Sequence, residues 1–386
     1  MATVTLRRKE LADALRVATR MIPRRLNIPA LGGVRLTVNG AVRLSATDLE
    51  YGAVLELTRA GGEGNADMLL PAARLSAQVR AGKGETVTLE SGECFTARLD
   101  GTAAVVGMDP ADFPTLPAGP EGELVAALDG AELVEVLRAV EFAVSGEIVR
   151  YALTGVLMEF EKNGGRVCLV ASDGKRLARW CMKGAVRQDA QVIVPVKALD
   201  TVADLATRDK GLVKVYVEQV KATNAETGES TTPEDADVTR VHFQLPKAGV
   251  FTRVVPGNFP NHWAVTPADL TCAWTMDRAA LTEAVEAILP ATTDKTRAVR
   301  FTRKGAEVEL FAKSADVGDA RAMVPVDGPA DEQCIVLNPE YVLDYLKALP
   351  RRVERVTMKL KSKDCATLWH GPKGHDYVMM PLTVNL

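Results

Sequence analysis

The sequence predicts an α+β protein of three tandem units, each with two helices packed on antiparallel sheets. Amphipathic helical segments begin at residues 10, 132 and 280, which are 122 and 148 residues apart. Alternating apolar runs separated by tight turns follow each segment, as expected for antiparallel strands. A pattern that recurs at a similar interval indicates internal repeats, so we expect three copies of one unit.

The first helix of each unit is predicted by apolar residues at positions i, i+4 and i+7, which form one helical face. The three sets are Leu11, Leu15 and Ala18; Leu133, Leu137 and Val140; and Leu281, Val285 and Ile288. A second helix is predicted to open at Pro71, at Pro195 and at Asn338. Proline suits a first helical turn and asparagine suits an N-cap, which favours these starting points.

Tight turns separate the predicted strands, and positive φ is expected at both residues of an Asn-Gly hairpin. The hairpin turns are Asn39-Gly40, Asn163-Gly164-Gly165 and Lys304-Gly305. An aspartate turn then recurs in each unit, at Asp48, Asp173 and Asp316. Because the aspartate recurs in this position, we interpret it as a turn former rather than as a catalytic acid.

The predicted domains are residues 1–120, 121–268 and 269–386. The longer second interval is explained by one polar segment, Lys221–Arg240, which carries five acidic residues against two basic ones. It has no hydrophobic periodicity, so we expect a solvated loop inserted into the second domain.

The composition is typical of a soluble globular protein, with 47% hydrophobic and 25% charged residues in a chain of 386. No apolar run approaches the ~20 residues that span a bilayer, and the N-terminus lacks the apolar core of a signal peptide. We therefore expect a cytoplasmic protein. The six cysteines form no CxxC pattern and are expected to be reduced, and His370 and His375 are interpreted as structural. No metal or other cofactor is expected.

Catalytic motifs are missing from the sequence. The segment Ala81–Thr86, AGKGET, lacks the leading glycine of a phosphate-binding loop and is interpreted as a turn that ends a helix. No GxSxG, HExxH or paired-carboxylate motif is apparent. The sequence therefore gives little support to an enzyme.

Positive charge is concentrated in the predicted helices of the first unit. Arg7–Arg25 has a net charge of +5 and Pro71–Lys83 of +3, whereas the whole chain has −3. A charged face is often only a solvated face. The same segregation also suits a protein that holds phosphates without reading a nucleotide sequence.

Several motifs in this order resemble those of the beta subunit of bacterial DNA polymerase III, the sliding clamp. They are ATDLE (Ala46–Glu50), RYALTGVLMEF (Arg150–Phe160), VASDGKRLA (Val170–Ala178), FPNHW (Phe259–Trp263), LNPEYVLDYLKAL (Leu337–Leu349) and YVMMPL (Tyr377–Leu382). The resemblance covers essentially the whole chain. It implies a non-catalytic processivity factor, a head-to-tail homodimer that forms a closed ring around double-stranded DNA.

The resemblance also implies functional residues. Those expected to face DNA are Arg25, Arg150, Tyr151 and Lys197, and charge alone adds Arg74 and Arg80. Water-mediated contacts from such side chains would hold phosphates without fixing the register, as sliding requires. Ala152 stands where many relatives have a second tyrosine, which puts one DNA contact in doubt.

A peptide-binding pocket between the second and third domains is likewise implied. Its residues are Leu153, Ser172, Gly174, Lys175, Arg176, Leu177, Pro260, Val265, Asn338, Tyr341, Val378, Met379, Met380, Pro381 and Leu382. Apolar walls with flexible methionines suit adaptable peptide capture. Three differences bear on its preference: Lys175 replaces a common histidine, Ala264 replaces an arginine of some relatives, and the chain continues past Leu382.

The partners implied are the replicative polymerase catalytic subunit, the clamp loader and other clamp-binding proteins of replication and repair. Two other functions remain possible from the residues alone. One is an enzyme that uses Asp48, Asp173 or a histidine in a cleft between units. The other is a repeat scaffold that binds proteins and not DNA.

Overall fold

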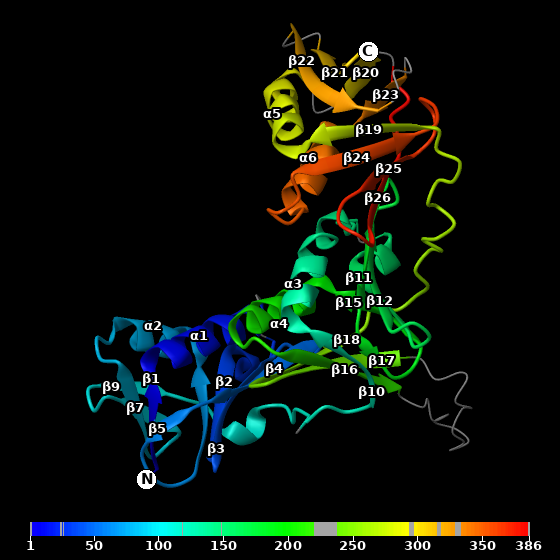
Figure 1. Cartoon of the computed structure of the whole chain (residues 1–386). Helices are drawn as coiled ribbons and strands as arrows, with labels where there is room; N and C mark the ends of the chain where they lie inside the picture. The colour runs from blue at the N-terminus through cyan, green and yellow to red at the C-terminus, as the bar shows by residue number, and fades with distance from the viewer. Residues whose placement is uncertain are drawn as a thin grey trace. The chain divides into compact units, whose positions relative to one another are not determined.

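The computed structural model describes residues 2–23, 25, 27–117, 119–147, 149–219, 238–292, 297–314, 318–328 and 333–384. The chain divides into two compact units, coloured along the sequence in Figure 1. Unit 1 comprises residues 1–131 and 197–254, and unit 2 comprises residues 132–196 and 255–386.

The structure confirms all six predicted helices. Their bounds are α1 Arg8–Ala18, α2 Ala72–Ala81, α3 Gly130–Arg138, α4 Val196–Arg208, α5 Arg278–Ile288 and α6 Pro339–Ala348. All nine apolar residues that predicted the first helices are buried, each at most 2% exposed. Asn338 is the N-cap of α6, where its side chain accepts a hydrogen bond from the Glu340 amide at 2.9 Å. None of the helices among the described residues has the length and apolar character needed to cross a membrane.

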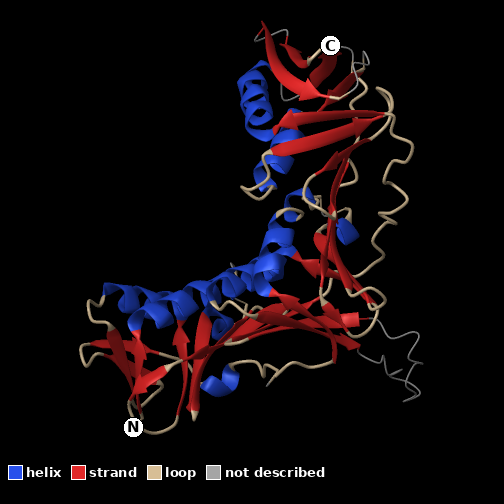
Figure 2. Cartoon of the chain, viewed as in Figure 1, coloured by secondary structure: helices blue, strands red, loops and turns tan. Residues whose placement is uncertain are grey.

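Unit 1 contains two antiparallel sheets with α1, α2 and α4 layered on one side (Figure 2). Its strands are β1 Thr3–Arg7, β2 Gly33–Asn39, β3 Ala41–Thr47, β4 Tyr51–Leu57, β5 Arg59–Gly61, β6 Ala66–Pro71, β7 Thr86–Ser91, β8 Thr96–Leu99, β9 Ala103–Val106, β10 Glu123–Asp129, β16 Leu212–Gln219, β17 Val238–Leu245 and β18 Ala248–Arg253. One sheet has the order β5-β1-β7-β8-β9, and the other contains the run β10-β16-β17-β18-β4-β3-β2-β6.

The pairing of β18 with β4 joins segments that are far apart in the sequence. Phe251 lies opposite Gly52, and a Cβ at Gly52 would meet the Phe251 ring at 2.5 Å. Glycine is therefore required for this close approach. Strands from the first two predicted repeats thus form one continuous sheet.

Unit 2 contains an antiparallel sheet with the order β15-β11-β12-β13-β26-β25-β24-β19-β22-β21-β20-β23. Its strands, with β14, are β11 Gly155–Glu161, β12 Arg166–Ser172, β13 Arg176–Lys183, β14 Ala185–Val186, β15 Ala190–Pro195, β19 Cys272–Asp277, β20 Val299–Lys304, β21 Glu307–Ser314, β22 Gly318–Asp327, β23 Cys334–Leu337, β24 Arg355–Leu360, β25 Thr367–His370 and β26 His375–Met379. Pairing of β13 with β26 joins the second and third predicted repeats.

Some local predictions were wrong. Pro71 is the N-cap of α2 and Pro195 ends β15, so both precede their helices instead of opening them. Gly40 has a φ of 71°, but Asn39 is not in the positive-φ region, so the two-residue hairpin geometry does not apply. Val238–Arg240 begin β17 and do not belong to a loop. The rest of the polar insert and Asp316 lie outside the described residues.

The expectation that all cysteines are reduced was also wrong for one pair. Cys168 and Cys181 lie directly opposite each other on β12 and β13 and form a disulfide. Their Cα atoms are only 4.0 Å apart because cross-strand neighbours approach closely. Sequence spacing did not indicate this pairing, since it depends on the register of the hairpin.

Candidate peptide pocket and nucleic-acid interface

The turn at Asp173 is built from side-chain hydrogen bonds to its own backbone. Asp173 Oδ1 accepts hydrogen bonds from the Lys175 and Arg176 amides at 2.9 and 3.0 Å. The Ser172 hydroxyl accepts from the Gly174 amide and donates to the Arg176 carbonyl. Gly174 has a φ of 84°, which glycine adopts without strain. The structure therefore confirms the aspartate as a turn former.

This turn places two distant motifs side by side. β13, which begins at Arg176, pairs with β26 so that Arg176 is opposite Met379 and Leu177 is opposite Val378. The Met380 amide continues the pairing with a 2.9 Å hydrogen bond to the Lys175 carbonyl. The SDGKRLA and VMMPL segments therefore lie side by side in one sheet, although about 200 residues separate them in the sequence.

Arg176 is the most extensively bonded of the predicted pocket residues. Its guanidinium donates to Asp344 Oδ2 at 2.6 Å, to Asp173 Oδ2 at 3.1 Å and to the Phe142 carbonyl at 2.9 Å. It also lies 4.2 Å from the centre of the Tyr341 ring, a cation–π contact. Burial by itself would lower the pKa of Arg176, but the neighbouring acidic groups outweigh it and raise that pKa. Arg176 therefore stays charged and fixed.

Apolar residues of the predicted pocket belong partly to the core. Leu177 and Val378 lie in a buried cluster with Val170 and Leu368, against which Phe259 packs. Met379 and Leu153 are also buried. Residues of this kind position the surface and are not all available to a ligand.

Other predicted pocket residues differ in exposure. Met380 and Val265 expose about half of their side chains, at 51% and 50%. Gly174, Lys175 and Pro260 are exposed. Tyr341, Pro381 and Leu382 are half-buried, and Ser172 and Asn338 are buried. The Leu382 amide donates to the Val336 carbonyl, which holds the C-terminal segment against β23.

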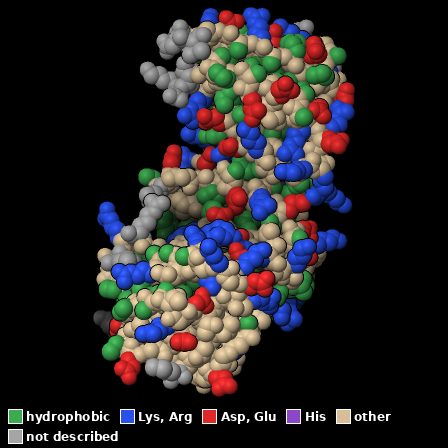
Figure 3. All heavy atoms as spheres, turned by 90° about the vertical axis from the view of Figure 1, so that its left-hand side faces the viewer, with side chains coloured by type: hydrophobic (Ala, Val, Ile, Leu, Met, Phe, Trp, Pro, Cys, Tyr) green, Lys and Arg blue, Asp and Glu red, His purple; other side chains and the backbone are tan. Residues whose placement is uncertain are grey.

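The residues expected to face DNA differ in the groups that they contact. Arg25, Arg74 and Arg80 are exposed, the last two on α2. Tyr151 is 54% exposed. Figure 3 shows that Lys and Arg side chains are interspersed with Asp and Glu on the face drawn.

Arg150 and Lys197 are also exposed, but each binds an aspartate turn. Arg150 Nη1 donates to the Asp173 carbonyl at 2.7 Å. Lys197 Nζ lies 3.0 Å from Asp48 Oδ2 and 4.2 Å from the centre of the Tyr51 ring. Both cations are therefore held at the recurring aspartate turns.

A cluster of arginines around Asp204 was not among the predicted site residues. Arg16 and Arg20 lie 3.3 and 3.4 Å from the Asp204 carboxylate, and Arg208 lies 3.1 Å from it. Three cations against one carboxylate leave a local positive charge. Only the Asp204–Arg208 spacing of four residues was visible in the sequence.

Arg8 contributed to the predicted basic face but is used internally. Its guanidinium donates to the carbonyls of Val79, Gly84 and Thr86 and to Asp100. These bonds satisfy the C-terminal end of α2 and fix the AGKGET turn, which the structure confirms as a helix end. Arg8 is therefore not a free cation.

Three family models match consecutive parts of the chain. They describe the N-terminal, central and C-terminal domains of the DNA polymerase III beta subunit, and match residues 2–117, 127–261 and 264–383, respectively. Together they account for nearly the whole sequence.

Whole-chain comparisons agree with the family models. The beta sliding clamps of Pseudomonas putida and Pseudomonas aeruginosa are 26% and 27% identical, each over 98% of this chain and 99% of the relative. The crystal structure of the DNA polymerase III beta subunit of Thermotoga maritima has a TM-score of 0.86 at 22% identity, over 100% of both chains. A Pseudomonas aeruginosa sliding clamp bound to griselimycin has a TM-score of 0.88 at 24% identity, over 99% of this chain and 100% of that one. The chain belongs to the DNA polymerase III beta-subunit family, the sliding clamps, which are processivity factors and not enzymes.

Proposed function

We propose that two copies of this chain form a head-to-tail ring around duplex DNA, and that each copy captures partner peptides beside β13 and β26. The pairing of these strands carries the peptide-binding proposal, because it assembles distant motifs into one surface. The partners are the replicative polymerase, the clamp loader and other replication and repair proteins, and the location is the cytoplasm. The three domains are residues 1–120, 121–268 and 269–386.

The chemistry of this surface suits a short peptide with apolar anchors. Met380 is half exposed and adapts its shape easily, while the fixed Arg176 and Tyr341 provide a rigid polar wall. The Pseudomonas aeruginosa relative bound to griselimycin supports a ligand site on a protein of this fold. Lys175 is exposed and adds a positive charge, so acidic residues in the peptide would strengthen binding.

A titration of a fluorescent partner peptide tests the pocket. A small interface with two or three anchors gives an expected Kd in the micromolar range. Met380→Ala removes an exposed anchor without disturbing the core, and should weaken binding by about 10-fold. The matched control is Leu212→Ala, which shortens a side chain that is 55% exposed in unit 1. Equal affinity for the two variants would exclude Met380 from the site.

The ring requires an interface between copies of the chain, and open strand edges suit one. β9 is the last strand of its sheet and exposes 59% of Val106. On β22, only Val326 and Asp327 pair with β19, while Met323 is 43% exposed. Strand pairing between the β9 and β22 edges of different subunits would cover both.

Sedimentation tests this interface. Wild type should sediment at micromolar concentration as a dimer of twice 41.4 kDa. Val106→Lys or Met323→Lys should shift it toward the monomer, whereas Leu212→Lys should not. A wild-type monomer under these conditions would contradict the ring.

DNA contact is proposed for Arg25, Arg74, Arg80, Arg150, Tyr151 and Lys197, and also for the three arginines around Asp204. Replacing Arg25, Arg150 and Lys197 by alanine should weaken DNA retention and flatten its salt dependence, because fewer counterions are displaced. Retention assays on duplexes of different sequence should show equal affinities. Strong preference for one sequence would contradict a sliding ring.

A further inference from the structure

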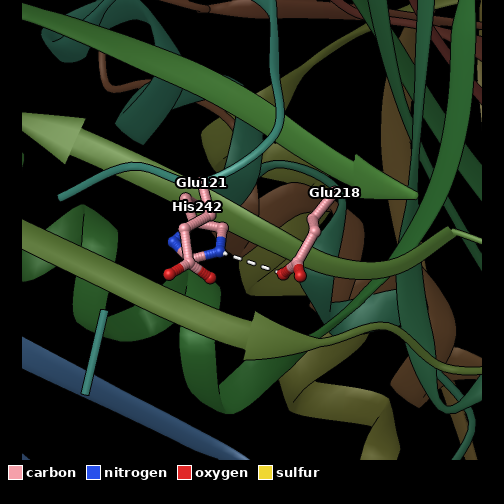
Figure 4. A group of neighbouring side chains, drawn as sticks. All are labelled: Glu121, Glu218 and His242. Carbon is pink, nitrogen blue, oxygen red and sulfur yellow. Dashed lines mark ion pairs between the residues drawn. The ribbon is translucent and has the colours of Figure 1, made fainter. Parts of the chain in front are cut away.

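Three potential metal ligands meet in unit 1, away from the proposed peptide surface. They are Glu121, in the segment before β10, Glu218 on β16 and His242 on β17 (Figure 4). Their ligand atoms all lie within 4.8 Å of one another. The sequence showed no sign of this group, because roughly 100 residues separate the first member from the second.

Sheet register explains why the three side chains converge. β16 lies between β10 and β17, and Tyr216 is directly opposite His242. Glu218, two residues beyond Tyr216, therefore points to the same face as His242. Gly122 has a φ of 91°, and a Cβ there would meet the Val217 carbonyl oxygen at 2.3 Å. This glycine lets the chain press against β16 and sets Glu121 beside Glu218.

Two buried polar atoms in the group have no hydrogen-bond partner. His242 is only 4% exposed, and both its Nε2 and Glu218 Oε2 are buried without one. These two atoms lie 3.5 Å apart and face each other. Buried polar atoms almost always have a partner in native proteins. A cation between them would satisfy both atoms.

His242 Nε2 and Glu218 Oε2 form a long ion pair with each other, and neither atom has a hydrogen bond from another described group. Arg240 lies 3.9 Å from Glu218 Oε2, which is too far for a hydrogen bond. The exposed Glu121 supplies a second carboxylate from the solvent side.

We propose that Glu121, Glu218 and His242 bind a divalent transition-metal ion of the zinc class. One imidazole nitrogen and two carboxylates suit Zn²⁺, whereas Mg²⁺ and Ca²⁺ prefer oxygen ligands alone. Two ligands on one Zn²⁺ lie at most roughly 4.4 Å apart. The exposed Glu121 can close the remaining few tenths of an ångström by changing its rotamer.

Such an ion would fasten the segment before β10 to β16 and β17. The ion would stabilise unit 1 because it binds only the folded state. Metal binding would be a function of this chain in addition to DNA and peptide binding. The effect is measurable on the full chain without any assay of clamp activity.

The test uses the full-length chain without a polyhistidine tag. Co²⁺ should bind with one ion per chain and give visible d–d absorption of a low-symmetry site, and Zn²⁺ should displace it. Isothermal titration with Zn²⁺ should show at least about 100-fold weaker binding for His242→Gln and about 10-fold weaker binding for Glu121→Gln. Saturating Zn²⁺ should raise the Tm of wild type by about 5 °C and leave that of His242→Gln unchanged. Because Glu121 is exposed, its variant should fold normally.

The chain provides a matched control in its other buried His–Glu pair. His262 Nε2 lies 3.4 Å from Glu159 Oε2, and no third ligating group joins this pair among the described residues. His262→Gln should therefore bind Zn²⁺ as wild type does. The proposal is overturned if wild type binds no Zn²⁺, if Glu121→Gln and His242→Gln bind it normally, or if His262→Gln loses binding equally.

Discussion

The turns at Asp48 in unit 1 and Asp173 in unit 2 have the same backbone design and hold different cations. In the first, Asp48 Oδ1 accepts from the Glu50 and Tyr51 amides, as Asp173 Oδ1 does from the Lys175 and Arg176 amides. Thr47 takes the place of Ser172, accepting from the amide two residues on and donating to the carbonyl four residues on.

The two turns differ in the cation that the second carboxylate oxygen of the aspartate contacts. Asp48 Oδ2 contacts Lys197, whose side chain is 53% exposed, whereas Asp173 Oδ2 contacts Arg176, whose side chain is 10% exposed. One turn thus holds a cation that can exchange its carboxylate for a phosphate, and the other fixes a cation inside the protein. The same local motif holds an exposed cation in one unit and a largely buried cation in the other.

Removing each aspartate should show the largest difference between the turns. Asp173→Ala deletes two backbone hydrogen bonds and one counter-ion of buried Arg176, so it should lower the free energy of unfolding by about 3 kcal/mol. Asp48→Ala deletes the same backbone bonds but an exposed ion pair, and should cost about 1 kcal/mol. Asp173→Asn keeps the turn acceptor and should be milder than Asp173→Ala.

Fluorescence can assign these losses to a unit. All four tryptophans, Trp180, Trp263, Trp274 and Trp369, belong to unit 2. Denaturation followed by tryptophan emission should therefore shift for Asp173→Ala and change little for Asp48→Ala, while circular dichroism reports both units. Equal shifts in emission would show that the turns are energetically equivalent.

Lowering the pH should destabilise the β13–β26 strand pair, which carries the second turn. Burial lowers the pKa of His375, which lies opposite Trp180 in the β13–β26 pair, to about 4. The unfolded chain, with a histidine pKa of about 6.5, binds more protons between those values, so stability falls as pH drops from about 6.5 to about 4. Between pH 7 and pH 5 the loss should be about 2 kcal/mol.

The check is guanidinium denaturation at pH 7 and pH 5, followed by tryptophan emission. His375→Gln should show a smaller pH dependence over this range. The pKa of Asp376 is lowered to about 2, because its bonds to His370 and Arg179 outweigh the opposing effect of burial. Its contribution is lost only below pH ~4, outside the measured range. An unchanged pH dependence in His375→Gln would exclude His375 as the source.

Substitutions at the positive-φ residue of each turn should have smaller effects on stability, and the two effects should have opposite signs. Leu49 has a φ of 78° and is 47% exposed, so Leu49→Gly should relieve backbone strain and stabilise the protein by up to about 1 kcal/mol. Gly174→Ala should destabilise it by at least about 1 kcal/mol, since a Cβ would lie 1.9 Å from Arg150 Nη1. Thermal unfolding of the two variants measures both signs, and the same sign for both would mean that φ does not govern these turns.

Local features of the fold were predictable from the sequence because they depend on neighbouring residues. Helical periodicity located the first helix of each predicted unit, and proline or asparagine indicated where the second helix begins. The recurring Asp48 and Asp173 identified the turns. Pairings of β4 with β18 and of β13 with β26 were not predictable from periodicity, which specifies no partner.

The candidate sites show the same limit. The resemblance named Arg176 as a pocket residue, but its bonds to Asp344 and the Phe142 carbonyl depend on segments far from it in sequence. Arg8 counted as a surface charge until the structure placed it against the end of α2. Glu121, Glu218 and His242 have no spacing that would reveal a common site.

The pairing of β13 with β26 has a consequence for synthesis of the chain on the ribosome. β13 begins at Arg176, and its partner strand ends at Met379, about 200 residues later. At a translation rate of roughly 5–20 residues per second, β13 remains an unpaired edge for roughly 10–40 s. The edge of β4 that pairs with β18 remains unpaired for a similar time, since the two strands start at Tyr51 and Ala248, also about 200 residues apart. Both edges can template pairing with another nascent chain during that interval, so chaperone demand should be highest before the last strand of each sheet has emerged.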